Sequence, residues 1–189
     1  LAAAVEAAPD DLEARFELGH AYALAAKREL AEAEFARVMA GDPDNAKRLA
    51  SKVLADRATF FVYKLDRDPD ATIAALEQLQ REFPTSKEAI AAYRTIGRAH
   101  CKQGREAEAI AALQAMVATD LADTALAASF GWFSFRERCG PEAGLAAVLG
   151  GIAQAPDDAD LRYVEAELQR MLGEPDLALA AIQAAAALE

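Results

Sequence analysis

A repeat period of 34 residues constrains this chain more than any other feature of its sequence. Pro9 and Pro43 lie 34 residues apart, each is followed by an aspartate, and each closes a stretch of helical spacing. Large apolar residues recur at similar steps of 34, 41, 37, 35 and 34, at Leu1, Phe35, Leu76, Leu113, Val148 and Ile182. A period of roughly 20 to 50 residues is typical of repeat architectures, in which each unit buries its apolar side against its neighbour. The chain is therefore expected to be a stack of repeats.

Each repeat is expected to contain two antiparallel helices. Within the first full period, one set of residues at helical spacing precedes a polar turn and another follows it: Leu18, Gly19 and Tyr22, then Ala31, Phe35 and Val38. The composition agrees, because 53% of the residues are hydrophobic but only 7% are aromatic. Alanine carries much of the hydrophobic share, favours helix and lets helices approach closely.

The residues of this first period resemble a complete tetratricopeptide repeat (TPR). The resemblance is carried by Leu18, Gly19, Tyr22, Ala31, Phe35 and Pro43. It implies that Gly19 and Ala31 are the small residues where the two helices of a repeat touch. It also implies an all-α fold, a right-handed α-α superhelix (a TPR-like solenoid) of antiparallel helix pairs whose first helices line a concave groove.

The same frame recurs along the chain, around Gly97, Trp132 and Ala166. In the last copy Glu165 takes the position of a core leucine. The resemblance therefore predicts one solenoid over 1–189, made of a lone second helix (1–9), a repeat (10–43), an enlarged repeat (44–84) and three further repeats (85–121, 122–156 and 157–189). The incomplete units at the two ends suggest a piece of a longer protein.

Several local signals predict where helices start and stop. The enlarged repeat is expected to have a long first helix from about residue 45 to 65, and Asp68 with Pro69 is a good start for its second helix. Thr85 and Glu88 have the spacing of a capping box. Turns that contain glycine and proline are expected at 139–141 and 173–175.

The net charge of −11 disfavours partners that are themselves anionic. With a pI near 4.7, nucleic acid and anionic lipid surfaces are unfavourable partners. No apolar run approaches the roughly 20 residues that span a bilayer. The chain is expected to be soluble, with a cytoplasmic location favoured over a periplasmic one.

One acidic segment has part of a calcium-loop pattern. Asp66, Asp68, Asp70 and Glu77 stand at the first, third, fifth and twelfth places of such a loop. Ala71 occupies the place that needs glycine, and Pro69 restricts the loop. The same acids fit a helix N-terminus, where they favour the positive end of the dipole, so no calcium site is predicted.

No catalytic or cofactor-binding pattern is found. His20 and His100 lie in different repeats without a second metal ligand at helical spacing, and no phosphate-binding loop or nucleophile motif occurs. Cys101 and Cys139 lack the spacing of a redox or zinc site. They are expected to be reduced and partly buried, with a bridge between neighbouring repeats as the alternative. The sequence thus predicts no enzyme, no cofactor and no metal.

The resemblance directs attention to the concave groove. Arg94, Arg98 and Lys102 follow one another at i, i+4 and i+8, so they form one stripe on a helix. The side chains predicted to line the groove are Phe16, His20, Arg94, Arg98, Lys102, Phe133, Arg136, Tyr163 and Arg170. We expect the basic ones to bind carboxylates, similar to the carboxylate clamp of chaperone-binding TPR proteins, although the paired asparagine of that clamp is missing. The alternative is a solvated face whose arginines pair with nearby acids.

Together these features predict a scaffold module that binds a protein or peptide partner in the concave groove, through acidic groups of that partner. A second interpretation is a regulatory or substrate-presenting appendage of a larger enzyme, because the stretch from Gly131 to Cys139 weakly resembles repeats of bacterial thioredoxin-fold proteins. The chain itself contains no thioredoxin active-site motif. A third interpretation is self-association through the apolar faces of the end repeats.

Overall fold

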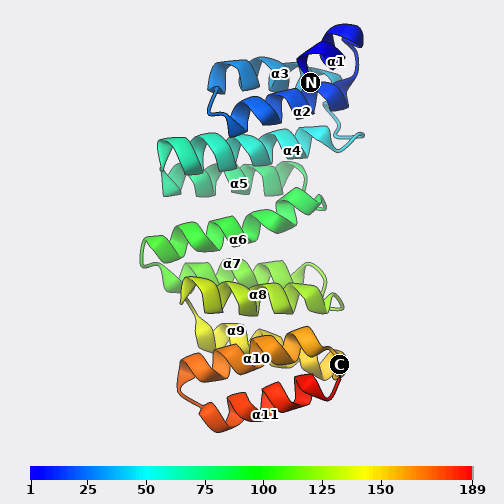
Figure 1. Cartoon of the computed structure of the whole chain (residues 1–189). Helices are drawn as coiled ribbons and strands as arrows, with labels where there is room; N and C mark the ends of the chain where they lie inside the picture. The colour runs from blue at the N-terminus through cyan, green and yellow to red at the C-terminus, as the bar shows by residue number, and fades with distance from the viewer. Residues whose placement is uncertain (189) are drawn as a thin grey trace. The chain divides into compact units, whose positions relative to one another are not determined.

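The computed structural model describes residues 1–188, and in this range the regular secondary structure is entirely helical, with no β-strand. By its internal contacts it divides into two compact units, Leu1–Ala92 and Tyr93–Glu189. The boundary falls inside one helix, α6 (Lys87–Lys102), whose first residues belong to unit 1 and whose remainder belongs to unit 2. The predicted all-α fold class is confirmed (Figure 1).

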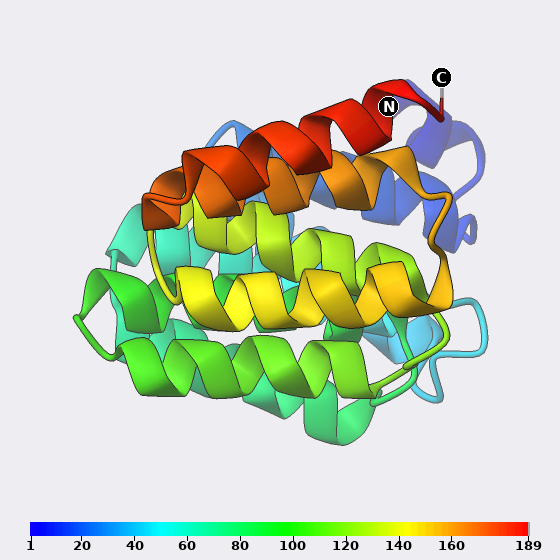
Figure 2. The ribbon, with the colours of Figure 1, turned by 90° about the horizontal axis from the view of Figure 1, so that it is seen from below.

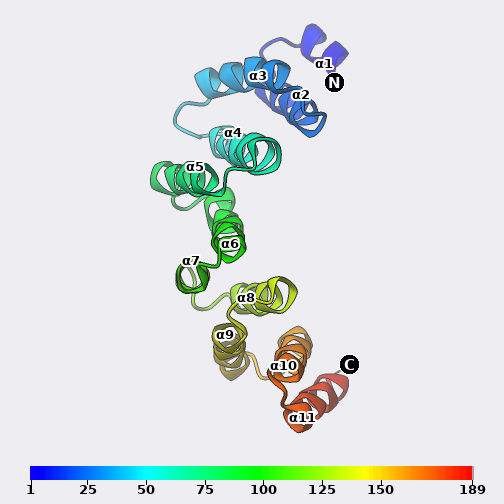
Figure 3. The same cartoon turned by 90° about the vertical axis from the view of Figure 1, so that its left-hand side faces the viewer.

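Unit 1 contains two helix pairs and a short preceding helix. Its elements before α6 are α1 (Ala2–Ala7), α2 (Leu12–Leu24), α3 (Arg28–Gly41), α4 (Leu49–Asp56), the π-helix η1 (Arg57–Asp66) and α5 (Pro69–Glu82). Helix α2 packs against α3 and against α4, while α5 packs against α4 and η1 (Figure 3). The apolar core of this unit is built around Phe35, Val38, Leu49 and Val53, all of which are almost completely buried.

Unit 2 continues the pattern of pairs. Its elements after α6 are α7 (Glu106–Ala118), α8 (Thr124–Glu137), α9 (Pro141–Gln154), α10 (Ala159–Leu172) and α11 (Pro175–Ala186). Helix α8 packs against α9 and α10 packs against α11, and each of these pairs is antiparallel (Figure 2). Helix α10 also contacts both members of the preceding pair. The shared core includes Val148, Leu161, Val164 and Leu168, so Glu165, which is half-buried and bonded to Arg162, is not needed to fill it.

Aspartate side chains and glycine–proline turns define several of the helix starts. The N-cap aspartates each accept a hydrogen bond from a backbone N–H of the first turn, and they are Asp11, Asp68, Asp123 and Asp158. The predicted start of α5 at Asp68 and Pro69 is confirmed. Helices α9 and α11 open with prolines directly after the predicted turns, in which Gly140 and Gly173 have positive φ angles of 61° and 84°.

The predicted capping box at Thr85 is wrong by one residue. Ser86 is the residue that caps α6, because its Oγ accepts the N–H of Ala89 at 3.0 Å. Glu88 does not close a box with the N-cap. Its carboxylate instead accepts a hydrogen bond from Ser51 Oγ of α4 at 3.1 Å. A tertiary partner thus replaces the local contact that the spacing suggested.

The long first helix of the enlarged repeat changes from α-helical to π-helical winding along its length. The sequence predicts one helix from about 45 to 65, whereas the structure has α4 followed without a break by the ten-residue π-helix η1. Its aromatic residues take part in ring contacts within unit 1: Phe61 lies 6.4 Å from Phe35, and Phe60 meets His20 edge to face at 5.3 Å. π-helical segments are uncommon and occur frequently at functional sites.

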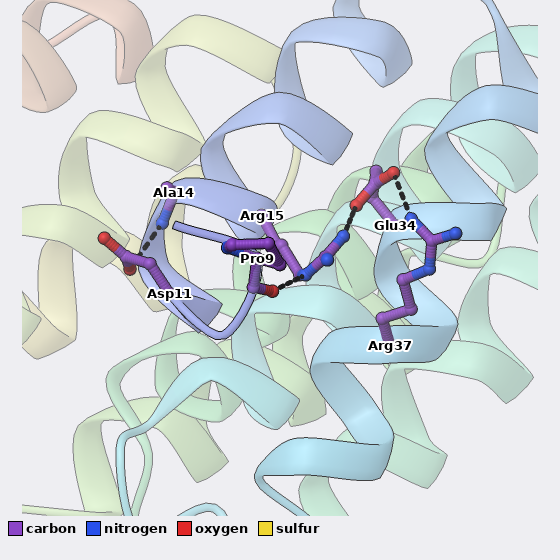
Figure 4. A network of polar contacts seen from close by, with 6 residues as sticks. All are labelled: Pro9, Asp11, Ala14, Arg15, Glu34 and Arg37. Atoms are coloured by element: carbon purple, nitrogen blue, oxygen red, sulfur yellow. Dashed lines mark hydrogen bonds and ion pairs between the residues drawn. The ribbon is translucent and has the colours of Figure 1, made fainter. Parts of the chain in front are cut away.

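A buried glutamate ties the first helix pair together (Figure 4). Glu34 of α3 binds Arg15 of α2 at 2.8 Å and Arg37 of its own helix at 2.9 Å. The Nε of Arg15 also donates to the carbonyl of Pro9, at 2.6 Å, in the turn before α2. Because two guanidinium groups share its carboxylate, Glu34 can be buried without leaving an unpaired charge.

The loop before α4 is organised by Asp42, which is also buried. Its carboxylate accepts the backbone N–H groups of Lys47 and Leu49, each at 2.9 Å, and that of Ala50 at 3.4 Å. Burial is the largest single influence on the pKa of Asp42 and acts to raise it. The backbone hydrogen bonds together outweigh burial, so the pKa lies below the ordinary value of 3.8.

We expect Asp42→Ala to lower the free energy of unfolding by roughly 2 kcal/mol, because it leaves the buried N–H groups of Leu49 and Ala50 without an acceptor. Urea denaturation at neutral pH measures this loss. Asp44→Ala, an exposed aspartate of the same loop, is the control and should change little. Since the pKa of Asp42 is depressed, its contribution is present above pH 3.8 and is lost as the pH falls through the lowered value. Equal stability of the two variants would contradict the role of Asp42.

Candidate functional site

Two candidate sites lie mainly on the first helices of the repeats. Within residues 1–188, no group of histidine, cysteine, aspartate and glutamate side chains could hold a metal ion. None of the helices in this range is long and apolar enough to cross a membrane. Of the suspected calcium ligands, Asp66 pairs with Arg28 at 2.7 Å and Asp68 caps α5.

A pocket of about 360 Å³ lies on the first-helix side of unit 1. We call it the His20 pocket, and the side chains that matter to it are Phe16, Glu17, His20, Lys52, Asp56 and Glu88. They come from α2, α4 and the first turn of α6. The volume falls within the range of small-molecule and side-chain sites in proteins.

A histidine–aspartate pair spans α2 and α4 in this pocket. His20 Nδ1 lies 2.7 Å from Asp56 Oδ2, and only 14% of the Asp56 side chain is exposed. The pKa of Asp56 lies above the usual carboxyl value, because burial, the largest influence, and the neighbouring Glu17 raise it by more than the hydrogen bond and charge of His20 lower it. Lys52 also acts to lower it. The ionisation of Asp56 is thus coupled to several charged groups around the same hollow.

In unit 2 the first helices α6, α8 and α10 present a second candidate surface. We call it the arginine face and define it by Arg94, Arg98, Trp132, Arg136 and Arg170. Arg98 is bound to Glu137 at 2.7 Å, and Arg170 is bound to Glu167 at 2.8 Å on its own helix. Part of the predicted basic set therefore pairs with acids of the chain, as the alternative interpretation expected.

Two arginines of this face have no acidic partner among the described residues. Arg94 is exposed and reaches only Ser129 Oγ, at 3.5 Å. Arg136 is exposed, and its guanidinium lies over the ring of Trp132 at 5.4 Å. Trp132 is half-buried, stands 6.0 Å from Phe135 in a T-shaped contact, and points its indole N–H at Asp160. This combination offers guanidinium groups beside an aromatic surface.

The predicted groove residues divide between the two units. Phe16 and His20 belong to unit 1, and the remaining seven belong to unit 2. The aromatic residues Phe16 and Phe133 were expected to offer apolar contacts, but they are only 7% and 5% exposed. Phe133 packs against Gly97, and Phe16 forms a wall of the His20 pocket. Lys102 is exposed, and Tyr163 is half-buried on α10.

The expectation of reduced cysteines is wrong. Cys101, at the end of α6, and Cys139, directly after α8, form a disulfide with a Cα–Cα distance of 6.2 Å. The stacking of two successive repeats brings these ends together, whereas 38 positions separate them in sequence. The bridge between neighbouring repeats, considered as the alternative, is what the structure shows.

Sequence reasoning did not single out Lys52, Asp56 or Glu88 as site residues. The irregular spacing of the enlarged repeat hid them, because Asp56 follows His20 by 36 residues instead of 34. Trp132 was recognised as part of a repeat but not as a surface residue. A scan for charged residues within two positions of one repeat length after His20 would have found Lys52 and Asp56.

No protein-family model and no curated protein matches the sequence. Solved structures do resemble it. PilW, described as a widely conserved type IV pilus biogenesis factor, aligns with a TM-score of 0.60 at 15% identity over 94% of this chain and 78% of its own. MamA aligns with a TM-score of 0.57 at 18% identity, covering 94% of this chain and 91% of MamA.

A third similar structure is YrrB, described as a TPR protein with an unusual peptide-binding site. It aligns with a TM-score of 0.53 at 17% identity over the whole of this chain and 91% of YrrB. At such identities the likeness concerns the fold alone. The chain has a TPR-like fold, as the repeat pattern predicted.

Proposed function

We propose that this protein is a non-enzymatic binding module that holds an acidic peptide segment of another protein on the arginine face of unit 2. The observation that carries the proposal is the pair of exposed guanidinium groups, Arg94 and Arg136, that lack an acidic partner among residues 1–188 and lie beside Trp132. Arginine next to an aromatic surface is the combination that dominates many protein interfaces. YrrB, with its peptide-binding site, supports the general role by analogy of fold.

The spacing of Arg94 and Arg136 suggests which kind of peptide segment fits the arginine face. Ser129, which Arg94 contacts, precedes Arg136 by seven residues on α8, which corresponds to about 10 Å along the helix. In a peptide with polyproline II conformation, residues three positions apart lie on the same face and are separated by about 9 Å. Two glutamates at this spacing could each meet one guanidinium, while an apolar residue between them contacts Trp132.

The bound arginines of the face can contribute as well. The pair of Arg98 and Glu137 is partly exposed, with exposed fractions of 40% and 24% for the two side chains. Ion pairs of this kind contribute little stability, so a ligand carboxylate can compete for the guanidinium at small cost. Arg98 is therefore expected to strengthen binding less than Arg94 and Arg136.

Arg94→Glu and Arg136→Glu are each expected to weaken binding of a fluorescent peptide with two glutamates three positions apart by about tenfold, because each removes a charge-assisted hydrogen bond and adds a repelling charge. Fluorescence anisotropy at low salt measures the affinity. Raising the ionic strength should weaken binding of the original chain, since exposed charges are screened.

Two controls make this experiment specific. Arg81→Glu changes an exposed arginine of α5 outside the arginine face and should leave the affinity unchanged. A peptide with glutamine in place of both glutamates should bind poorly. If the glutamine peptide binds as tightly as the acidic one, or if both arginine variants retain full affinity, the proposal fails.

A further inference from the structure

The His20 pocket of unit 1 has the opposite charge preference to the arginine face. Three carboxylates border it, from Glu17, Asp56 and Glu88, and one basic side chain, Lys52, opposes them. Three carboxylates against one ammonium group give the pocket an excess of negative charge. A bound cation would reduce the repulsion between the carboxylates, whereas a bound anion would increase it.

One of these carboxylates, that of Asp56, is held in place before any ligand arrives. Asp56 Oδ2 accepts a hydrogen bond from His20 Nδ1 at 2.7 Å. The His20 ring in turn packs against the rings of Phe60 and Phe16, with centroid distances of 5.3 and 6.0 Å. The second oxygen of Asp56 has no hydrogen-bond partner within residues 1–188, and the carboxylate lines the open hollow. A fixed carboxylate in a partly desolvated setting binds a cation better than a free one in water.

A cation of the chain itself, the ammonium of Lys52, already lies against the Phe16 wall of the pocket. The Nζ of Lys52 lies 5.4 Å from the centroid of the Phe16 ring, within the range of cation–π attraction. Lys52 also acts on the ionisation of Asp56. Its ammonium therefore lies over an aromatic ring and close enough to Asp56 to act on its ionisation, as an external amine in the pocket would.

We propose that the His20 pocket binds the ammonium group of a lysine side chain from a partner protein, and that Lys52 competes with it as an internal cation. The exposed position of Glu17 at the border and the mixture of carboxylate and aromatic walls fit a long aliphatic side chain that ends in a positive charge. This site lies in a different unit from the arginine face and does not depend on Arg94 or Arg136.

The test uses the full chain and three short fluorescent peptides. The first contains one lysine and has both ends blocked, the second replaces the lysine by acetyl-lysine, and the third has no lysine but a free amino terminus. We expect the first peptide alone to bind with measurable affinity by anisotropy. Binding of the third peptide as tightly as the first would mean that any amine is accepted and would overturn the assignment to lysine, and equal binding of the acetylated peptide would overturn the role of charge.

Variants of the pocket give changes of opposite sign. Asp56→Asn keeps an oxygen that can accept from His20 but removes the charge, and it should weaken binding of the lysine peptide by about tenfold. Lys52→Met removes the internal competitor and should strengthen it by about threefold. A structural role alone would not produce tighter binding, so weaker or unchanged binding by Lys52→Met contradicts the proposal.

The matched controls separate this site from the rest of the molecule. Glu29→Gln removes an exposed carboxylate of α3 outside the pocket, and Arg94→Glu alters the arginine face; both should leave binding of the lysine peptide unchanged. Circular dichroism and thermal melting of each variant establish that it is folded. Loss of lysine-peptide binding by Glu29→Gln as large as that by Asp56→Asn would show a diffuse charge effect and overturn the site.

Discussion

Gly131→Ala is expected to lower the free energy of unfolding by roughly 3 kcal/mol, although alanine is the better helix former. A Cβ atom at Gly131 would lie 2.4 Å from Val148 Cγ2 and 2.4 Å from Val164 Cγ1. Both valines are completely buried, and their branched side chains have little rotational freedom. The methyl group can therefore be accommodated only if α8 moves away from α9 and α10.

Gly97→Ala provides a matched control at the equivalent position one period earlier. Gly97 precedes Gly131 by 34 residues, but its added Cβ would lie 3.4 Å from Leu113 and Phe133, which is ordinary van der Waals contact. This substitution should be neutral or should stabilise by up to about 1 kcal/mol, because it removes the backbone entropy of glycine. Urea denaturation followed by circular dichroism distinguishes the two variants. Similar midpoints for both would mean that the contact around Gly131 is looser than the structure shows.

The two glycines also show which structural features the repeat pattern can predict and which it cannot. The sequence identified the paired helices, the turns at Gly140 and Gly173 and the start of α5, because each of these depends on a few neighbouring residues. It could not predict that an added methyl group is tolerated at Gly97 but not at Gly131, since the difference depends on two valines from two other helices. Neighbouring residues in the sequence determine where helices end, whereas tertiary contacts determine whether an added methyl group can be accommodated.

The candidate sites were predicted less completely than the fold. Arg94, Arg136 and His20 were placed on first helices by the repeat frame, which follows from helical spacing alone. Lys52 and Asp56 were missed, because the enlarged repeat shifts their register and the π-helix η1 alters the winding directly after them. The alternative interpretation expected arginines of this face to pair with acids, but it did not name Glu137 as the partner of Arg98, since the two residues lie 39 positions apart.

The disulfide was the largest error of sequence reasoning, and it leads to the second prediction. Spacing suggested two independent thiols, but the bridge joins the end of α6 to the turn after α8 and so fastens the first helices of two successive repeats. Cross-linking across a loop of this length restricts the unfolded chain, and the loop-entropy relation gives a stabilisation of about 4 kcal/mol as an upper value. Arg98 and Glu137 lie within one helical turn of the two cysteines, so the bridge also helps to hold this ion pair.

The double variant Cys101→Ser with Cys139→Ser is accordingly expected to lose roughly 2 to 4 kcal/mol of unfolding free energy, measured by guanidinium denaturation without reductant. Adding reductant should lower the stability of the original chain to nearly that of the double variant, and it should leave the double variant itself unchanged. Alkylation of the unfolded, unreduced chain followed by mass spectrometry should find no free thiol on Cys101 or Cys139. A chain that takes up two alkyl groups under these conditions, or one whose denaturation midpoint is insensitive to reductant, would show that the two repeats are held together by packing alone.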